Sequence, residues 1–136
     1  MRYLAIDYGM KRTGLAVCDA EETIASPLAV VQGHKDLIER IKKIVASEGI
    51  GGIVVGLPLN MDDSEGPMAK LVQAFAKELG KQVPIPIHLQ DERLSSFEAE
   101  QKLQEFGLTR GKKRQRLDAL AAADILQTFL DQKTDR

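Results

Sequence analysis

The sequence lacks the patterns that mark disulfide-bonded and membrane-spanning proteins. Its 136 residues include a single cysteine, Cys18, so no disulfide can form within the chain. The apolar residues around Cys18 favour a small buried side chain over a metal ligand or a nucleophile. No apolar run reaches the ~18 residues that a membrane-spanning helix needs, and Met1 leads directly into a strand-like segment without a leader pattern. We therefore expect a cytoplasmic protein.

The chain also lacks an excess of charge of either sign. It has 19 lysines and arginines against 20 aspartates and glutamates, for a net charge of −1. This balance excludes a uniformly basic surface, so any binding to phosphate groups must come from a local cluster. One cluster places five basic residues within seven positions: Arg110, Lys112, Lys113, Arg114 and Arg116. We interpret it as a basic loop that contacts a phosphate backbone without reading base sequence, and a solvated loop is the alternative.

Hydrophobic periodicity predicts an α/β fold. The length and the 43% content of hydrophobic residues suit one domain, residues 1–136. Short apolar runs predict strands at residues 3–6, 13–18, 24–31, 53–55 and 85–90, and Pro27 places the third of these at an edge. Helical spacing with capping residues and glycine stops predicts helices at residues 37–45, 67–79, 95–106 and 117–130; the first has a capping box at residues 36–39. The order βββαβαβαα predicts a five-stranded mixed sheet with helices on both faces.

Three acidic residues occupy positions that are unfavourable for a charge. Asp7 ends the first predicted strand, and Asp91 or Glu92 ends the fifth. Asp118 lies in the first turn of the last predicted helix, on its apolar face, where the helix dipole favours a negative charge. Asp124 lies on the opposite side of that helix, and we expect it to be solvated.

These acids predict a metal site at one edge of the sheet. Parallel strands deliver their carboxyl ends to the same edge, so Asp7 and Glu92 should meet there. Neighbours on an extended strand point to opposite faces, so only one of Asp91 and Glu92 can face the cluster. Two carboxylates about 4 Å apart repel by ~4 kcal/mol at an effective dielectric constant of 20, so a cluster of three without basic neighbours needs a cation. Oxygen-only ligands favour Mg²⁺ or Mn²⁺, and such ions suit phosphodiester hydrolysis.

Four short motifs occur in order along the chain, and together they resemble the YqgF family. They are Asp7-Tyr-Gly9 with Arg12 and Gly14, Gly56-Leu-Pro-Leu-Asn60, Asp91-Glu-Arg-Leu-Ser95 and Asp118-Ala-Leu-Ala-Ala122. The resemblance implies an RNase H-like fold. It also implies a bacterial nuclease similar to those assigned to maturation of the 5′ end of pre-16S rRNA. The alternative is a Holliday junction resolvase-like endonuclease, because the family is akin to RuvC-type enzymes.

The resemblance also implies roles for particular residues. The catalytic, metal-binding acids fall on Asp7, Glu92 and Asp118. Contacts to structured RNA or branched DNA are expected from Arg12, Asn60 and Arg93, together with the basic cluster at residues 110–116. We expect a monomer or a weak homodimer, and symmetric resolution of a four-way junction would require the dimer.

Two further functions stay open from the sequence. The spacing of Asp7, Gly9 and Gly14 also resembles the phosphate-binding hairpin of the actin and sugar-kinase fold, in which backbone N–H groups hold nucleotide phosphates. Those phosphotransferases close two such domains around ATP, and this chain has the length of one. A non-catalytic RNA-binding module would use the basic cluster, but it has no reason to keep three converging acids.

Overall fold

A five-stranded mixed sheet organises the protein, as the sequence predicts. The computed structural model describes residues 1–60, 62, 64–92 and 110–134, with the side chains of 110–117 and 134 outside the described part. The strands are β1 (Arg2–Asp7), β2 (Arg12–Cys18), β3 (Ala25–Gln32), β4 (Ile50–Leu57) and β5 (Ile87–Asp91), in the spatial order β3-β2-β1-β4-β5. β2 pairs antiparallel with β1 and β3, whereas β4 pairs parallel with β1 and β5. The carboxyl ends of β1, β3, β4 and β5 therefore lie at one edge, called here the carboxyl edge.

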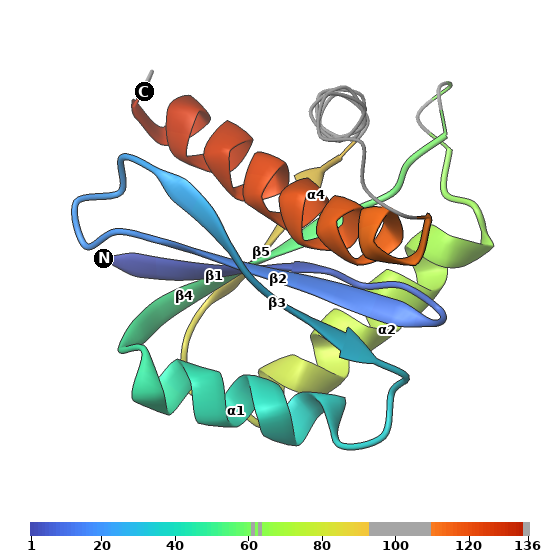
Figure 1. The fold of residues 1–136 in the computed structure, drawn as a ribbon, viewed down its shortest axis with the longest axis horizontal. Helices are drawn as coiled ribbons and strands as arrows, with labels where there is room; N and C mark the ends of the chain where they lie inside the picture. Colours follow the sequence, from blue (N-terminus) through green and yellow to red (C-terminus); the bar gives the residue numbers. More distant parts are fainter. Residues whose placement is uncertain (61, 63, 93–109, 135–136) are drawn as a thin grey trace.

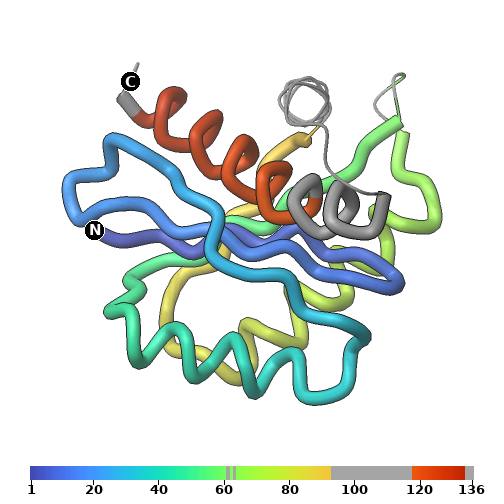
Figure 2. Tube along the Cα trace, viewed as in Figure 1, coloured from blue at the N-terminus to red at the C-terminus, as the bar shows by residue number. Residues whose placement is uncertain are grey.

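Helices cover both faces of the sheet (Figure 1). Helices α1 (Leu37–Ser47) and α2 (Pro67–Gly80) pack on one face, and α4 (Arg110–Thr134) packs on the other. The helix expected at residues 95–106 lies outside the described residues. Within the described part of the chain, no helix combines the length and the apolar composition that crossing a membrane requires. Figure 2 shows the N-terminus and the C-terminal end of α4 on the side of the sheet away from the carboxyl edge.

The central strands are apolar throughout because each face of the sheet has its own core. Leu4 and Ile6 of β1 belong to the core under α1 and α2, whereas Tyr3 and Ala5 belong to the core under α4. This explains the unbroken apolar runs, since a strand buried on both faces shows no polar alternation. Continuing the alternation, Asp7 faces the α4 side of the sheet.

The start of the last helix differs from the prediction. α4 begins at Arg110, so the basic cluster forms the first turns of a helix instead of a loop. Lysine, arginine and glutamine are good helix formers, and no proline interrupts the segment. Asp118 is eight residues beyond Arg110, roughly two turns into the helix, so the helix dipole does not account for its charge.

Two smaller predictions about charged residues are also wrong. The capping box at the start of α1 does not form: Asp36 has a φ of 61° and makes no side-chain cap hydrogen bond. The burial of Leu37 and Ile41 stabilises this helix instead. Asp124, predicted to be solvated, is only 9% exposed. It lies on the side of α4 away from the sheet-facing residues Ala122 and Ile125.

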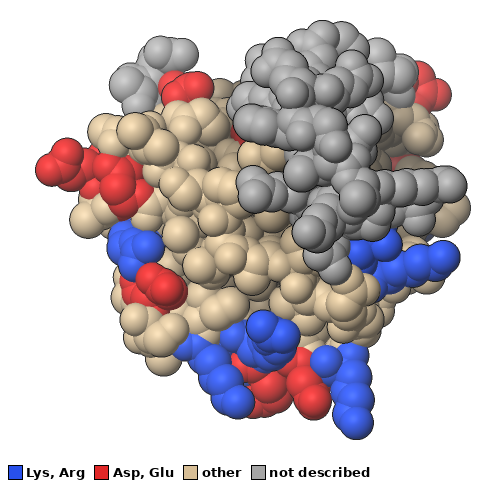
Figure 3. Space-filling view, viewed as in Figure 1, with Lys and Arg blue, Asp and Glu red and all other residues tan. Residues whose placement is uncertain are grey.

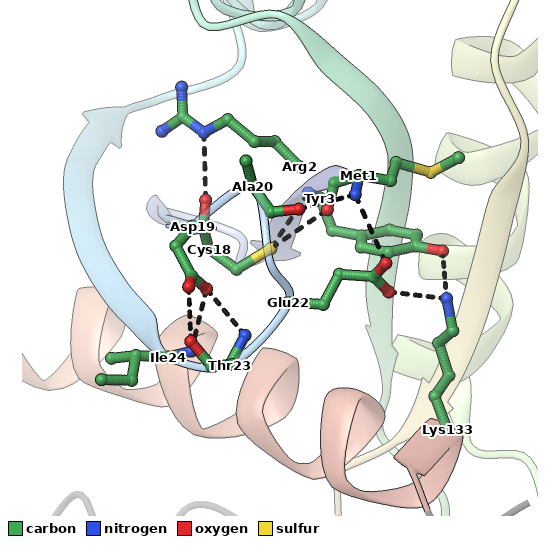
Figure 4. A network of polar contacts seen from close by, with 10 residues as sticks. All are labelled: Met1, Arg2, Tyr3, Cys18, Asp19, Ala20, Glu22, Thr23, Ile24 and Lys133. Atoms are coloured by element: carbon green, nitrogen blue, oxygen red, sulfur yellow. Dashed lines mark hydrogen bonds and ion pairs between the residues drawn. The ribbon is translucent and has the colours of Figure 1, made fainter.

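Hydrogen bonds fix the C-terminal end of α4 to the β2–β3 hairpin (Figure 4). The Lys133 ammonium donates to Tyr3 Oη at 2.8 Å and to Glu22 Oε1 at 2.7 Å. The N-terminal ammonium also contacts Glu22, at 3.3 Å from Oε2. Asp19 closes the hairpin turn by accepting hydrogen bonds from Thr23 and from the Ile24 backbone. Three separate segments are thus joined at the end of α4 farthest from the carboxyl edge.

A glycine lets the other end of α4 lie directly on the sheet. A Cβ atom at Gly14 of β2 would lie 2.0 Å from the Asp118 carbonyl oxygen and 2.4 Å from its carbonyl carbon. A backbone atom cannot rotate away as a side chain can. Gly14 therefore sets the distance between α4 and β2, and with it the position of Asp118.

Replacing Gly14 by alanine should destabilise the protein by pushing α4 off β2. We expect Gly14→Ala to lower the free energy of unfolding in urea by about 2–3 kcal/mol, the usual cost of an overpacked site. Gly80→Ala is the matched control, because its Cβ would lie at an ordinary 3.6 Å from Ile87 Cδ1. The control should change stability by less than about 1 kcal/mol. Equal stability of the two variants would contradict the close contact at Gly14.

Candidate active site

The ends of β1 and β5 bring two carboxyl groups into contact. Glu92 directly follows β5, and its backbone N–H donates to the Leu57 carbonyl at 3.3 Å, which extends the β4–β5 pairing by one residue. The side chains of Asp7 and Glu92 are hydrogen-bonded to each other. Of the two candidate acids at the end of β5, Glu92 is therefore the one that meets Asp7.

A second glycine provides the space for Glu92. A Cβ atom at Gly56 of β4 would lie 2.5 Å from Glu92 Oε2 and 2.6 Å from Ile125 Cδ1. The Glu92 carboxyl group and the Ile125 side chain of α4 thus occupy the volume above Gly56. Any larger residue would displace one of them. Gly56 in the second motif is explained by this contact with the site.

Burial and like charges weaken the acidity of Asp7. The pKa of Asp7 rises from its usual 3.8 to about 8, first because burial disfavours the charged form, and then because Glu92 and Asp118 carry like charges nearby. The hydrogen bond that protonated Asp7 donates to Glu92 raises its pKa further. The pKa of Glu92 is also raised, chiefly by burial, against the lowering effect of that hydrogen bond. A pair that shares one proton is the state expected of adjacent acids without a cation.

Asp118 completes the acidic group and has a basic partner. Its charge contributes to the raised pKa of Asp7, so the helix brings it near the other two acids. Arg12 Nε donates to Asp118 Oδ2 at 2.8 Å, and the two side chains are about one quarter exposed, 25% and 23%. Arg12, predicted to contact nucleic acid, is thus positioned at the site as a partner of Asp118.

The donor set fits a divalent cation, although the carboxylates are not gathered around one point. Three carboxylates and no histidine or cysteine are the ligands that Mg²⁺ and Mn²⁺ prefer. Asp7 and Glu92 lack a positive partner in the contacts that raise their pKa values. Among residues 1–92 and 110–134 as described, no group of three acids, histidines or cysteines is close enough to hold an ion as it stands. A cation held by all three acids would need these side chains to lie closer together than they do here.

The other predicted contacts to nucleic acid are only partly described. Asn60 is exposed in the loop after β4, at the carboxyl edge, where its side chain donates to Ser64 Oγ at 2.9 Å. Arg93 lies outside the described residues. The basic cluster of residues 110–116 lies on the first turns of α4, immediately before Asp118, and its side chains are outside the described part.

The described surface agrees with a balanced charge. On the face in Figure 3, lysine and arginine side chains alternate with acidic ones along the lower side, over α1. A further group of basic side chains lies at the right, toward the end of the sheet where the β1–β2 hairpin turns. On this face the described residues form no continuous basic surface.

The two glycines of the site are the residues whose roles sequence analysis missed. The sequence prediction places a turn glycine at Gly14 and a strand end at Gly56, without a close approach of other groups to either. Both interrupt otherwise apolar strands, and a glycine inside a strand often marks a close approach of another group. That signal was present in the sequence, but the approaching groups, Asp118 and Glu92, come from distant positions.

Comparisons with known proteins find similar sequences along nearly the whole chain. Residues 1–132 match the RuvX family, described as "Holliday junction resolvase". A protein of Anaeromyxobacter sp. named "Putative pre-16S rRNA nuclease" is 48% identical over 134 residues, which cover 96% of this chain and 97% of that protein. A protein of Maridesulfovibrio salexigens with the same name is 41% identical over 132 residues, covering 96% and 98%.

Solved structures support the fold. Thermus thermophilus RuvC in complex with a Holliday junction substrate superposes with a TM-score of 0.64 at 16% identity, covering 99% of this chain and 96% of that one. The fowlpox virus resolvase bound to Holliday junction DNA gives a TM-score of 0.58 at 11% identity, covering 98% and 99%. Likeness at such low identity concerns the fold alone, which is RNase H-like as predicted. The family match and the relatives show that the chain belongs to the RuvX family, also called YqgF, as its motifs predicted.

Proposed function

We propose that the protein is a divalent-metal-dependent nuclease that processes the 5′ end of pre-16S rRNA. The observation that carries this proposal is the convergence of Asp7, Glu92 and Asp118 at the carboxyl edge, with the pKa of Asp7 raised to about 8 by burial and like charges. The names of relatives that are 41–48% identical over nearly the whole chain support the rRNA substrate. Such an enzyme would act in the cytoplasm, as the sequence led us to expect.

Asp7, Glu92 and Asp118 would hold Mg²⁺ or Mn²⁺. The bound metal would activate a water molecule and stabilise the leaving oxygen of the cleaved phosphodiester. Asp7 and Glu92 would give up their shared proton and supply negative charge from a buried position. Arg12 Nε donates to Asp118 Oδ2 at 2.8 Å, so the other carboxylate oxygen would be the one that binds the metal. A ligand oriented by such a neighbour binds metal more tightly than a free one.

A Holliday junction resolvase is the second candidate. The description of the matching family favours it. Symmetric cleavage of a junction needs two copies of the site, so this function would require a homodimer. Family membership favours both nuclease activities over the phosphotransferase and the non-catalytic RNA-binding module considered from the sequence.

One experiment separates the two candidates. Purified protein is incubated with a pre-16S rRNA fragment and with a synthetic four-way junction, with and without Mn²⁺, and the mass of the protein in solution is measured. Specific cleavage of the RNA by a monomer supports the rRNA nuclease. Paired symmetric cuts in the junction by a dimer would favour the resolvase instead.

The raised pKa of Asp7 predicts that metal-free protein loses stability as the pH rises. Between pH 4 and pH 8 the folded state keeps a proton that the unfolded state has released, so the free energy of unfolding falls across this range. Asp7→Asn removes the effect. In EDTA at pH 8–9 the variant should exceed the wild type by at least about 1 kcal/mol, or roughly 3–5 °C in Tm, with little difference near pH 4.

Asp19 offers a control of the opposite sign. Hydrogen bonds from Thr23 and Ile24 lower the pKa of Asp19 to about 2, so its contribution is present above pH 4 and lost as the pH falls toward 2. Asp19→Asn should therefore be less stable than the wild type at neutral pH. If Asp7→Asn showed this same pattern, the interpretation of Asp7 as a buried, uncompensated acid would be wrong.

The metal site predicts a joint loss of activity and metal binding in Asp7→Asn. Mg²⁺ or Mn²⁺ should raise the Tm of the wild type and leave that of Asp7→Asn nearly unchanged, because binding to the folded state alone stabilises it. Cleavage should fall at least ~10²-fold, since a metal ligand is removed. Circular dichroism checks that the variant is folded. Cleavage at the wild-type rate by folded Asp7→Asn would remove Asp7 from the proposed site.

The basic cluster predicts a salt-dependent contribution to binding. Changing Lys112, Lys113 and Arg114 to glutamine should weaken RNA binding and reduce the slope of log K against log salt by about 2, because about 0.7 counterion is released per phosphate contact with a single strand. The matched control changes three exposed lysines: Lys43 of α1, Lys77 of α2 and Lys81 directly after α2. Equal effects of the two triple variants would mean that the cluster is an ordinary charged surface.

A further inference from the structure

A column of three rings lies next to the candidate active site and has no part in the proposed hydrolysis. Tyr8, directly after Asp7, stacks on Phe75 of α2 with the ring centroids 4.4 Å apart and the planes at 23°. His34, between β3 and α1, stacks on Tyr8 at 4.8 Å and 19°. Among the described ring contacts Phe75 and His34 do not touch, so Tyr8 lies between them. The column thus runs from the buried Phe75 to the exposed His34.

Hydrogen bonds hold the outer ring of the column in place. His34 Nε2 lies 2.6 Å from the Gly9 carbonyl oxygen, which can only accept, so Nε2 carries the hydrogen. His34 Nδ1 lies 3.4 Å from Tyr8 Oη. The Gly33 backbone N–H donates to the Lys11 carbonyl at 2.8 Å, which ties the two loops together. An exposed ring that is already fixed loses little entropy when a ligand packs on it.

The column and the acids share one edge of the sheet but lie on opposite sides of it. Successive residues of an extended strand point to opposite faces, so Asp7 faces α4 whereas Tyr8 packs with the core under α1 and α2. β3 also ends at this edge and leads into the loop that carries His34. A polynucleotide that crosses the carboxyl edge would pass the acids first and His34 next.

We propose that the outer face of His34 is a stacking platform for one unpaired nucleobase of the substrate. The inference rests on the proposed function, since it assumes a nucleic-acid substrate at the acidic site. Single-stranded segments are commonly held by aromatic or histidine rings that stack on their bases, with little preference for base identity. The platform selects nucleic acids with an unpaired nucleotide close to the cleaved bond, and it positions the chain by its base while α4 contacts phosphates.

Binding of short single-stranded RNA and of DNA with the same sequence tests the platform, in EDTA so that no cleavage occurs. His34→Ala should bind about 5- to 100-fold more weakly than the wild type, with the same salt slope, because stacking releases no counterions. His34→Phe keeps a ring on Tyr8 and should stay within about threefold of the wild type. Lys35→Ala, at the exposed neighbouring residue, is the matched control. A preference for one of the two strands shows which nucleic acid supplies the base.

An abasic scan identifies the stacked base. At one position of the oligonucleotide, removing the base should weaken binding to the wild type by the same factor as the His34→Ala substitution does. Binding to the His34→Ala variant should not weaken further when that base is removed. Equal affinities of the wild type and His34→Ala, or no position with this behaviour, would overturn the platform. Thermal unfolding of His34→Ala shows whether the fold is kept, and His34→Phe provides the test if it is not.

Cleavage assays separate this inference from the proposed nuclease. If cleavage of pre-16S rRNA depends on Asp7 but binding does not depend on His34, the platform is refuted and the proposed nuclease stands. Binding that depends on His34 without any cleavage would keep the platform and refute the nuclease. A protein that binds neither RNA nor DNA would refute both.

Discussion

The buried carboxyl group of Asp7, with Glu92 and Asp118 beside it, is the constraint on which the rest of the site depends. A strand end in a core is a costly place for one charge, and three acids cannot all be ionised there without a cation. The protein meets this cost by letting Asp7 and Glu92 share a proton and by pairing Asp118 with Arg12. Neither arrangement removes the negative potential of the group. In the proposed nuclease a divalent cation would neutralise it most completely, and the site would then suit phosphodiester chemistry.

The scaffold is arranged to hold these acids close to one another. Gly56 leaves room for Glu92 above β4, and Gly14 lets the backbone of Asp118 lie against β2. Lys133 anchors the far end of α4 to Tyr3 and Glu22, so the helix is fixed at both ends. Both glycines matter because they lack a side chain: a Cβ atom at Gly14 would push α4 away from the sheet, and one at Gly56 would push Glu92 away. The stability of the α4 contact and the geometry of the site are thus set by the same atoms.

In the proposed function, the carboxyl edge would hold a nucleic acid in two different ways. On the α4 side lie the acids and the basic first turns of the helix, which would hold the metal and contact phosphate groups. On the other side lies the ring column that ends at His34, which suits a base. The alternation of β1 produces this division directly, because Asp7 and Tyr8 are neighbours in sequence and opposite in direction. A substrate held at both places would be fixed in position and in polarity across the edge.

The sequence by itself determined the order of the strands and helices, the mixed sheet and the three acids, since these follow from local periodicity and from the shared edge of parallel strands. It also predicted the edge position of Pro27 and the burial of Cys18. Only the tertiary structure decided that Glu92 meets Asp7, that Arg12 pairs with Asp118, and that Tyr8 lies between Phe75 and His34. Two helix starts differ from what the sequence predicted: α4 extends through the basic cluster, whose residues are good helix formers, and α1 forms without its capping box. The physical reason is that the pattern along the chain fixes the direction in which a side chain points. The residue that it contacts is set by the packing of elements distant in the sequence, as for Arg12 and Asp118, which are 106 residues apart.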